Sequence, residues 1–255
     1  MTMNKALVFD KGNYRFVPTG VHRYSAGVAA QPGYEICRVV FSEPVPLNEG
    51  FAIIQAVLEA EERPLTALCA CELRSPEPAN AADFSSFNET YVQTLSDWGL
   101  IKGKHNPVAR CNVSPLVGAP AEPSFYAFSY TVETDIEEST FVISGSCEVP
   151  EVDGDDEHLV VAYRDVSPQG MLKKAQWVLD EMERRMQVLG FEWADTTATH
   201  AYTVHDVHAF MASELARRGA IQKGLGWHLA RPPVVDLEYE MDCRRILNER
   251  VLVID

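Results

Sequence analysis

The chain has 255 residues, of which 46% are hydrophobic and 23% charged, a composition typical of globular proteins rather than disordered or fibrous ones. Its 22 basic and 37 acidic residues give a formal net charge of −15. Because nucleic-acid phosphates and anionic lipids repel such a polyanion, we expect neither as a partner. No hydrophobic run approaches the ~20 residues that cross a membrane, and the first ten residues lack the hydrophobic core of a signal peptide. We therefore expect a cytoplasmic protein.

Much of the negative charge lies in one stretch in mid-chain. Residues 133–157 hold ten acidic side chains and no basic one, so the rest of the chain is close to neutral. We interpret this stretch as a solvated hinge and loop, because its acids lack the ordered spacing of a calcium-binding loop. The cysteines form no Cys-x-x-Cys motif, which favours buried free thiols over disulfides. They are Cys37, Cys69, Cys71, Cys111, Cys147 and Cys243.

The first half of the chain shows the pattern strand, strand, strand, helix, strand, helix, strand, strand. Hydrophobic runs bounded by proline and glycine predict the strands, and hydrophobic residues three or four positions apart predict the helices. The predicted strands are 14–17, 23–29, 36–41, 65–73, 108–116 and 124–132, and the helices begin at 46 and span 83–98.

The second half repeats a similar order of elements. Its predicted strands are 140–149, 159–163, 198–204, 226–231 and 235–243, and its helices are 169–189 and 206–218. Matching 25–27 with 143–145, and Asp83 with Asp206, gives a period near 120 residues. An internal repeat of this length predicts a tandem duplication. We place the first unit at 1–134 and the second at 135–255.

Each half resembles a RidA (YjgF-type) unit, a family of small trimeric proteins with a chorismate-mutase-like fold. The resemblance rests on Thr-Phe-Val-Ile-Ser-Gly-Ser at 140–146, Asp-Phe followed by Asn and Tyr within 82–91, Asn-Pro-Val-Ala-Arg-Cys at 106–111, and Leu-Glu-Tyr-Glu at 237–240. It implies an α+β fold of two tandem units, each a β-sheet covered on one face by two helices. It also implies a homotrimer, which buries the other faces of the sheets.

The resemblance also implies a site in the cleft between neighbouring units. In the family an Arg grips the substrate carboxylate, a Glu positions water, and the backbone near Ser-Gly contacts the ligand. The best-known members hydrolyse enamines and imines derived from amino acids to 2-keto acids and ammonia. Carried over by position, these residues fall on Arg110, with Cys111 beside it in the cleft, on Asn88, on Ser144 and Gly145, and on Glu240.

Each half departs from the family pattern in a different place. The closing strand of the first half, 124–130, contains no acid. In the second half Met211 stands where Asn88 stands in the first, and Gly224 lies near the position of the Arg. We therefore expect one composite site. The first half would supply Arg110 and Asn88, and the second half Ser144, Gly145 and Glu240.

The physical chemistry of these residues suits that role but leaves simpler readings open. A guanidinium binds a carboxylate through two parallel hydrogen bonds, and a partly buried carboxyl can act as a general acid or base. Arg110 could equally form a surface or interface salt bridge. Glu240 shares one strand face with Glu238 and Asp242, which a solvated face would also explain.

We expect no cofactor and no metal. Three histidines have ligand-like spacing, but no paired carboxylate or cysteine completes a set. They are His200, His205 and His208.

The sequence thus favours a hydrolytic deaminase of a small carboxylate-bearing enamine, imine or unsaturated amino acid. A non-catalytic ligand-binding or interaction protein is the alternative, since a decaying site would also lose its Arg or Glu in alternate halves. Chorismatase-like hydrolysis of a cyclic carboxylate is a second alternative. The name endoribonuclease often attaches to such sequences, but the negative charge argues against RNA as substrate. Convergence of Arg110 and Glu240 on one cleft would favour catalysis, and their placement on opposite faces would favour binding.

Overall fold

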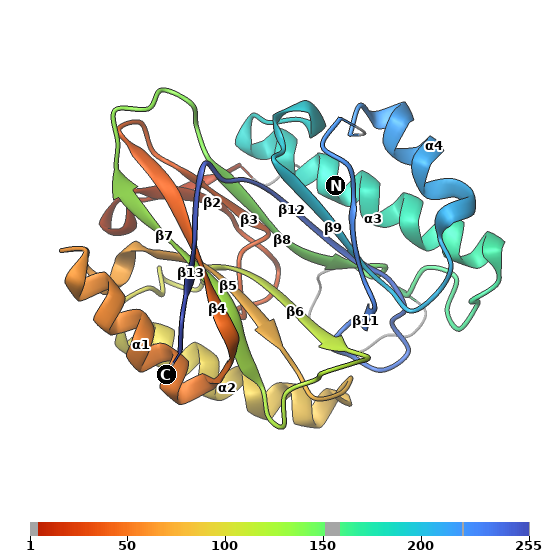
Figure 1. Ribbon diagram of the computed structural model, residues 1–255, viewed down its shortest axis with the longest axis horizontal. Helices are drawn as coiled ribbons and strands as arrows, with labels where there is room; N and C mark the ends of the chain where they lie inside the picture. The colour runs from red at the N-terminus through yellow and green to blue at the C-terminus, as the bar shows by residue number, and fades with distance from the viewer. Residues whose placement is uncertain (1–4, 151–158, 221, 255) are drawn as a thin grey trace.

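Two β-sheets pack against each other at the centre of the molecule, and helices cover their outer faces (Figure 1). The computed structural model describes residues 5–150, 159–220 and 222–254, with the side chains of 81–86 excepted. Helices α1 and α2 lie on the six-stranded sheet, and α3 and α4 on the seven-stranded sheet (Figure 1). Their bounds are Leu47–Ala60 for α1, Ala81–Asp97 for α2, Pro168–Leu189 for α3 and His208–Arg218 for α4.

The strands divide between the sheets as follows. The seven-stranded sheet has the order β1 (Leu7–Phe9), β2 (Tyr14–Val17), β3 (Gly27–Ala30), β8 (Phe141–Cys147), β12 (Glu240–Arg245), β9 (Ala198–Tyr202) and β10 (Gly226–His228). The six-stranded sheet has the order β11 (Ala230–Arg231), β6 (Ala109–Pro115), β5 (Leu68–Arg74), β7 (Ser124–Glu133), β4 (Tyr34–Pro46) and β13 (Asn248–Leu252).

The internal repeat is visible in this topology. In chain order, β4, α1, β5, α2, β6 and β7 form one unit, whose strands lie side by side as β6-β5-β7-β4. In the same way β8, α3, β9, α4, β10 and β12 form a second unit with the strand order β10-β9-β12-β8. The expected α+β class is therefore confirmed: two tandem units, each with a sheet covered on one face by two helices.

The two units exchange strands at their edges. The N-terminal strands β1 to β3 extend the sheet of the second unit, where β3 pairs with β8, and the C-terminal β13 extends the sheet of the first unit by pairing with β4. The predicted boundary between residues 134 and 135 stays a proposal. Strand pairing crosses this boundary in both directions, because β1 to β3 join the second sheet and β13 joins the first.

Three predictions about strands are wrong. The segment 25–27 is not the counterpart of 143–145: Gly27 pairs directly with Ile143, and β4 occupies the position equivalent to β8. Within 159–163, residues 161–163 form a turn, and Ala162 has a φ of 49°, a left-handed conformation that a strand does not use. The last of the predicted strands, which is β12, begins at Glu240 rather than at residue 235.

The helix that the pattern predicted most clearly forms as expected. The Ser167 side chain accepts a hydrogen bond from the Gly170 N–H, Pro168 occupies the first turn, and α3 ends at Gly190 with a left-handed φ of 82°. Its predicted hydrophobic face is buried against the seven-stranded sheet. That face consists of Met171, Ala175, Val178, Met182, Met186 and Leu189.

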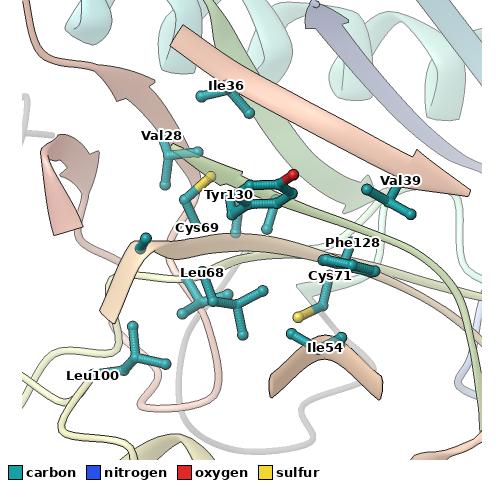
Figure 2. Packing of buried hydrophobic residues seen from close by; sticks show 14 of the residues in the cluster. Val28, Ile36, Val39, Ile54, Leu68, Cys69, Cys71, Leu100, Phe128 and Tyr130 are labelled. Atoms are coloured by element: carbon teal, nitrogen blue, oxygen red, sulfur yellow. The ribbon is translucent and has the colours of Figure 1, made fainter. Parts of the chain in front are cut away.

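A second hydrophobic core lies between the six-stranded sheet and its helices. Figure 2 shows Cys69 and Cys71 packed in this core among aliphatic and aromatic side chains such as Ile54 and Phe128. All six cysteines are free, and all but Cys147 are buried, as the sequence predicted. Cys69 and Cys71 are therefore core residues.

The acidic mid-chain stretch is only partly solvated. Glu137 and Glu138 are exposed, but Glu148 is fully buried in an ion pair with Lys174. Residues 151–158 lie outside the described chain. In the part that the structure describes, no helix has the length and hydrophobicity needed to span a bilayer.

Candidate active site

The six predicted site residues lie in one region, where β6 meets β8 and β12. The Arg110 backbone N–H donates a 3.0 Å hydrogen bond to the Ser144 hydroxyl, which itself donates to the Ser25 carbonyl at 2.6 Å. The Arg110 guanidinium donates a 2.6 Å hydrogen bond to the Asn88 side-chain oxygen on α2. Residues from both halves of the chain therefore meet at the edge of β6, as the composite-site hypothesis requires.

The start of β6 makes this meeting possible. The Ser25 N–H, just before β3, donates a 2.9 Å hydrogen bond to the Val108 carbonyl, and Ser25 bridges Ala109. The start of β3, next to β8 in the middle of the seven-stranded sheet, is thereby held against the first residues of β6 in the other sheet. Polar backbone groups that would otherwise be buried without partners are satisfied by this contact.

Glu240 is a buried carboxyl group held by two thiols. It is 2% exposed. The Cys111 thiol lies 3.5 Å from its Oε1 and the Cys147 thiol 3.3 Å from its Oε2, each as donor. Burial raises the pKa of Glu240 to about 8, with a smaller contribution from the negative charge of Asp242. Glu240 is therefore protonated at neutral pH, and its reading as part of a solvated strand face is wrong.

Gly145 lets the backbone of β8 approach this carboxyl. The pairing of β8 with β12 shifts register between Met241 and Cys243, which leaves a β-bulge around Ser144 and Gly145. A β-carbon on Gly145 would clash with Oε1 of Glu240 and lie 3.3 Å from the α-carbon of Cys111. Only glycine fits here without displacing the acid.

Arg110 and Glu240 approach β6 from opposite faces of its sheet. Neighbouring residues of a strand point to opposite sides, so Cys111 faces Glu240 while Arg110 faces α2. The Arg110 guanidinium carbon lies 4.8 Å from the Tyr24 ring centroid and 5.2 Å from that of Tyr91. Burial lowers the pKa of Arg110 from its usual value.

A small pocket nevertheless borders both faces at this junction. Strands β5, β6, β8 and β12 line it, and its lining includes Arg110, Cys111 and Ser144. The pocket reaches Glu72 and Asp242 on the inner side. Of the six predicted residues, Arg110, Cys111 and Ser144 line this pocket, and Asn88, Gly145 and Glu240 are not among its lining residues. The guanidinium and the carboxyl lie on opposite faces of the sheet, which is the placement expected to favour binding over catalysis.

The sequence analysis missed a group of buried polar side chains between the two sheets, the inter-sheet cluster. One ion pair and one hydrogen bond organise it. Arg38 donates to both oxygens of Glu72, at 2.6 and 2.7 Å, and the Tyr202 hydroxyl donates to Asp242 at 2.7 Å. His200 Nδ1 lies 3.3 Å from the Asp242 carboxylate. The inter-sheet cluster comprises Arg38, Glu72, Arg74, His200, Tyr202, His228, Asp242 and Arg244.

Electrostatics inside the cluster separate its carboxyl groups from Glu240. Burial acts to raise the pKa of Glu72, but the Arg38 guanidinium holds this pKa at about 2. Burial likewise opposes ionisation of Asp242, yet the hydrogen bond and charge of His200 hold its pKa well below the usual range. Burial lowers the pKa of His228 to about 4. The cluster therefore holds two ionised carboxylates and a neutral imidazole, whereas Glu240 is protonated.

One sequence signal could have found this cluster. Glu72 and Arg74 alternate with Cys71 and Leu73 along β5, as the acids near Glu240 do along β12. Each of these two strands carries polar residues on one face and hydrophobic residues on the other. Such a pair indicates two sheets that pack with their polar faces together. Which face is buried depends on the partner sheet, and local sequence does not specify that partner.

The three histidines do not form a common site. His205 contacts Glu238 at 2.8 Å, the exposed His208 contacts Asp206, and His200 belongs to the inter-sheet cluster. Across residues 5–150, 159–220 and 222–254, no group of three or more His, Cys, Asp or Glu side chains is arranged to hold a metal ion.

The chain before Glu240 is fixed by a buried ion pair. Glu148 accepts hydrogen bonds from the backbone N–H groups of Glu238 at 2.7 Å and Tyr239 at 3.1 Å. Lys174 of α3 donates to the same carboxylate at 3.1 Å, and both side chains are 0% exposed. This pair anchors the entry of β12, and with it the position of Glu240, to α3.

Comparison with known proteins agrees with this architecture. Residues 6–250 match the family described as 2-aminomuconate deaminase CnbZ. The 2-amino-5-chloromuconate deaminase of Comamonas testosteroni is 46% identical over 252 residues, 98% of this chain and 100% of that protein.

Solved structures show a related fold. A chorismatase matches with a TM-score of 0.52 and 12% identity over 91% of this chain and 80% of that chain. The YjgF protein of E. coli matches with a TM-score of 0.32 and 17% identity over 43% of this chain and 81% of that chain. The resemblance to a tandem RidA-like protein is confirmed, and the match over nearly its whole length shows that the chain belongs to the 2-aminomuconate deaminase CnbZ family.

Proposed function

We propose that this chain hydrolyses an unsaturated 2-amino carboxylic acid of the 2-aminomuconate type, releasing ammonia and a 2-oxo acid. The observation that carries the proposal is Glu240, a buried acid protonated at neutral pH at the junction where Arg110, Cys111, Ser144 and Gly145 meet. A general acid works best when its pKa lies near the operating pH. The family to which the chain belongs supplies the substrate class.

The chemistry needs one acid that later serves as base. In a 2-amino-2,4-dienoate the amino group is part of an enamine. Glu240 donates its proton to a chain carbon, and the C=C–N unit becomes a C=N unit. The resulting carboxylate then takes a proton from water as the water oxygen bonds to C2. Glu240 passes that proton to the nitrogen, the C–N bond breaks and ammonia leaves. The hydroxyl on C2 becomes the C=O group as its proton returns to the Glu240 carboxylate.

The proposed role of Arg110 is to bind the substrate carboxylate next to the reacting carbon. Asn88 holds one guanidinium N–H, so the orientation of the group is fixed before substrate arrives. Ser144 holds the Arg110 backbone and sets its distance from the bulge. By pairing with the carboxylate, the cation also makes the neighbouring C2 more electrophilic toward water.

Further properties remain proposals beside the activity. We propose a small carboxylate-bearing metabolite as the only partner besides further copies of the chain, a cytoplasmic location and no cofactor. We also propose a homotrimer, because the RidA-like proteins that each half resembles are trimeric. Sedimentation or light scattering in solution would show a mass three times that of the chain, and a stable monomer would contradict the trimer.

The activity is tested with purified chain and 2-aminomuconate. We expect stoichiometric formation of ammonia and a 2-oxo acid well above the uncatalysed rate. Glu240→Gln should lose most of this activity while still binding muconate, the analogue without the amino group. If the wild-type chain forms no ammonia above the uncatalysed rate, the proposed function is wrong.

A further inference from the structure

Arg74 is a buried cation without a carboxylate partner in the described chain. It ends β5, is 7% exposed, and donates one hydrogen bond, 2.8 Å long, to the carbonyl of Leu73. Its guanidinium carbon stacks 4.1 Å from the Tyr126 ring centroid. Among residues 5–150, 159–220 and 222–254, no acidic side chain comes within ion-pair distance of it.

The other two arginines of the inter-sheet cluster each have carboxylate partners. Arg38 pairs with Glu72 and Glu249, and Arg244 lies 3.7 Å from Asp242. A guanidinium has five N–H donors, and burying it without an anion costs free energy that a structural role alone does not repay. The aromatic face of Tyr126 offsets part of this cost and leaves the other donors of Arg74 available.

Arg74 lies on the same side of its sheet as Glu240. It alternates with Leu73 and so shares a face with Glu72, whose register partner on β6 is Cys111. Across the gap its guanidinium carbon is 5.8 Å from the ring centroid of Tyr202, and Tyr202 is the direct strand partner of Glu240. The positive charge of Arg74 also acts to lower the pKa of Glu240.

We propose that Arg74 binds the second carboxylate of a dicarboxylic substrate and so determines the specificity of the enzyme. This inference rests on the proposed function, in which Arg110 binds the first carboxylate. Arg110 and Arg74 lie on neighbouring strands, three register positions apart and on opposite faces, as the pairings of Cys71 with Arg110 and Arg74 with Val113 show. An extended six-carbon diacid carries its charges at its two ends, which suits two separated guanidinium groups.

Between the two cations, β8 packs directly on the edge of β6: the Arg110 N–H donates to the Ser144 hydroxyl, and Gly145 lies against Cys111. A diacid that reaches both cations must therefore separate β8 from β6 at this junction. Its middle carbons would then lie next to Glu240, where the proton transfers of the reaction are needed. A substrate with one carboxylate would leave Arg74 unpaired, and the enzyme would bind it less tightly.

Two unreactive probes separate the contribution of Arg74 from that of the rest of the site. Muconate is a six-carbon dienedioate, and sorbate is the same dienoate chain with one carboxylate. Calorimetric titration of the wild-type chain should show muconate binding about 10- to 100-fold more tightly than sorbate, the range expected for a charged hydrogen-bonded pair. Arg74→Gln should reduce this ratio to near one and leave sorbate affinity within about twofold of wild type.

Two further variants complete the test. Arg74→Lys keeps the charge without the planar fork and should restore part of the preference for muconate; it also serves if Arg74→Gln does not fold, which thermal melting will show. Arg250 lies on the distant strand β13 and pairs with Glu61. The variant Arg250→Gln is the control, and it should bind both probes as the wild-type chain does.

Three results would overturn the role of Arg74. These are equal wild-type affinity for the two probes, an unchanged ratio in Arg74→Gln with no gain in Arg74→Lys, and equal loss of both probes in both Arg74 variants. Failure of the proposed function is a separate result. It would be seen when the wild-type chain releases no ammonia, whatever the ratio of the two binding affinities.

Discussion

The Cys111 thiol donates a hydrogen bond to the Glu240 carboxyl at the junction of the two sheets, with 3.5 Å between sulfur and oxygen. Burial raises the pKa of the Cys111 thiol, and the nearby negative charge of Asp242 raises it further. The thiol therefore stays neutral and remains a weak donor. Because its donors are neutral, Glu240 is held in place without a counterion that would ionise it, and it remains a proton donor.

We predict that the activity depends on the protonated form of Glu240. Since the pKa of this group is raised to about 8 by burial, kcat/KM should fall as pH rises through about 8. Glu240→Gln should lower kcat by about 10²- to 10⁴-fold and remove this limb of the profile. Steady-state measurement of kcat/KM between pH 6 and 10 tests this prediction. A value that rises with pH through this range would mean that Glu240 acts only as a base.

The same group should make stability depend on pH. Glu240 binds its proton up to about pH 8 when folded but only to its usual 4.5 when unfolded, so unfolding releases a proton between these values. Its contribution to stability is complete below pH 4.5 and is lost as pH rises through about 8. Relative to wild type, Glu240→Gln should therefore gain on the order of 4 kcal/mol between pH 5 and 9, seen by urea unfolding at each pH. A constant difference across this range would contradict the raised pKa.

Gly145 should be required for activity more than for folding. Alanine at this position places a β-carbon against Oε1 of Glu240, and the flexible carboxyl end must move. We expect Gly145→Ala to lower kcat at least about tenfold through loss of positioned proton transfer. Gly118→Ala is the matched control, because Gly118 has a φ of 68° with no atom within 4 Å of the added carbon. It should cost about 1 kcal/mol of stability and leave kcat unchanged.

The buried ion pair behind Glu240 should be costly to break. Lys174→Met leaves the Glu148 carboxylate buried without its cation, which should destabilise the protein by about 3–5 kcal/mol. The exposed pair of Arg164 and Asp236 provides the comparison, and Arg164→Met should cost about 0–1 kcal/mol. Chemical denaturation of the two variants measures both values. Equal effects would show that the buried pair does not anchor β12.

Local sequence patterns predicted the helices, because helices depend on short-range spacing. The six candidate site residues came from the resemblance to the RidA family, and they stay a prediction. The missed strands β1 and β13 are short, and β13 lies at a sheet edge where four of its five residues are exposed, so no alternation marks it. Their pairing with distant strands exchanges material between the two units. That exchange is a property of long-range packing, and single stretches of sequence do not encode it separately.

The candidate site divides in the same way. The motif residues around Arg110 and Glu240 were recognisable one by one, but the opposite orientations of their side chains follow from alternation along β6 once its neighbours are known. Arg74 and Tyr202 were missed because their importance comes from the second sheet that covers them. The burial of Glu240, which sets its protonation state, has the same origin.

The most direct test of the central claim is a crystal structure of the chain with bound muconate. The account predicts one carboxylate on the Arg110 guanidinium, the carbon chain passing Ser144 and Gly145, and a middle carbon within hydrogen-bonding reach of Glu240 directly or through one water. Muconate bound elsewhere, with Arg110 and Glu240 both out of contact, would contradict it.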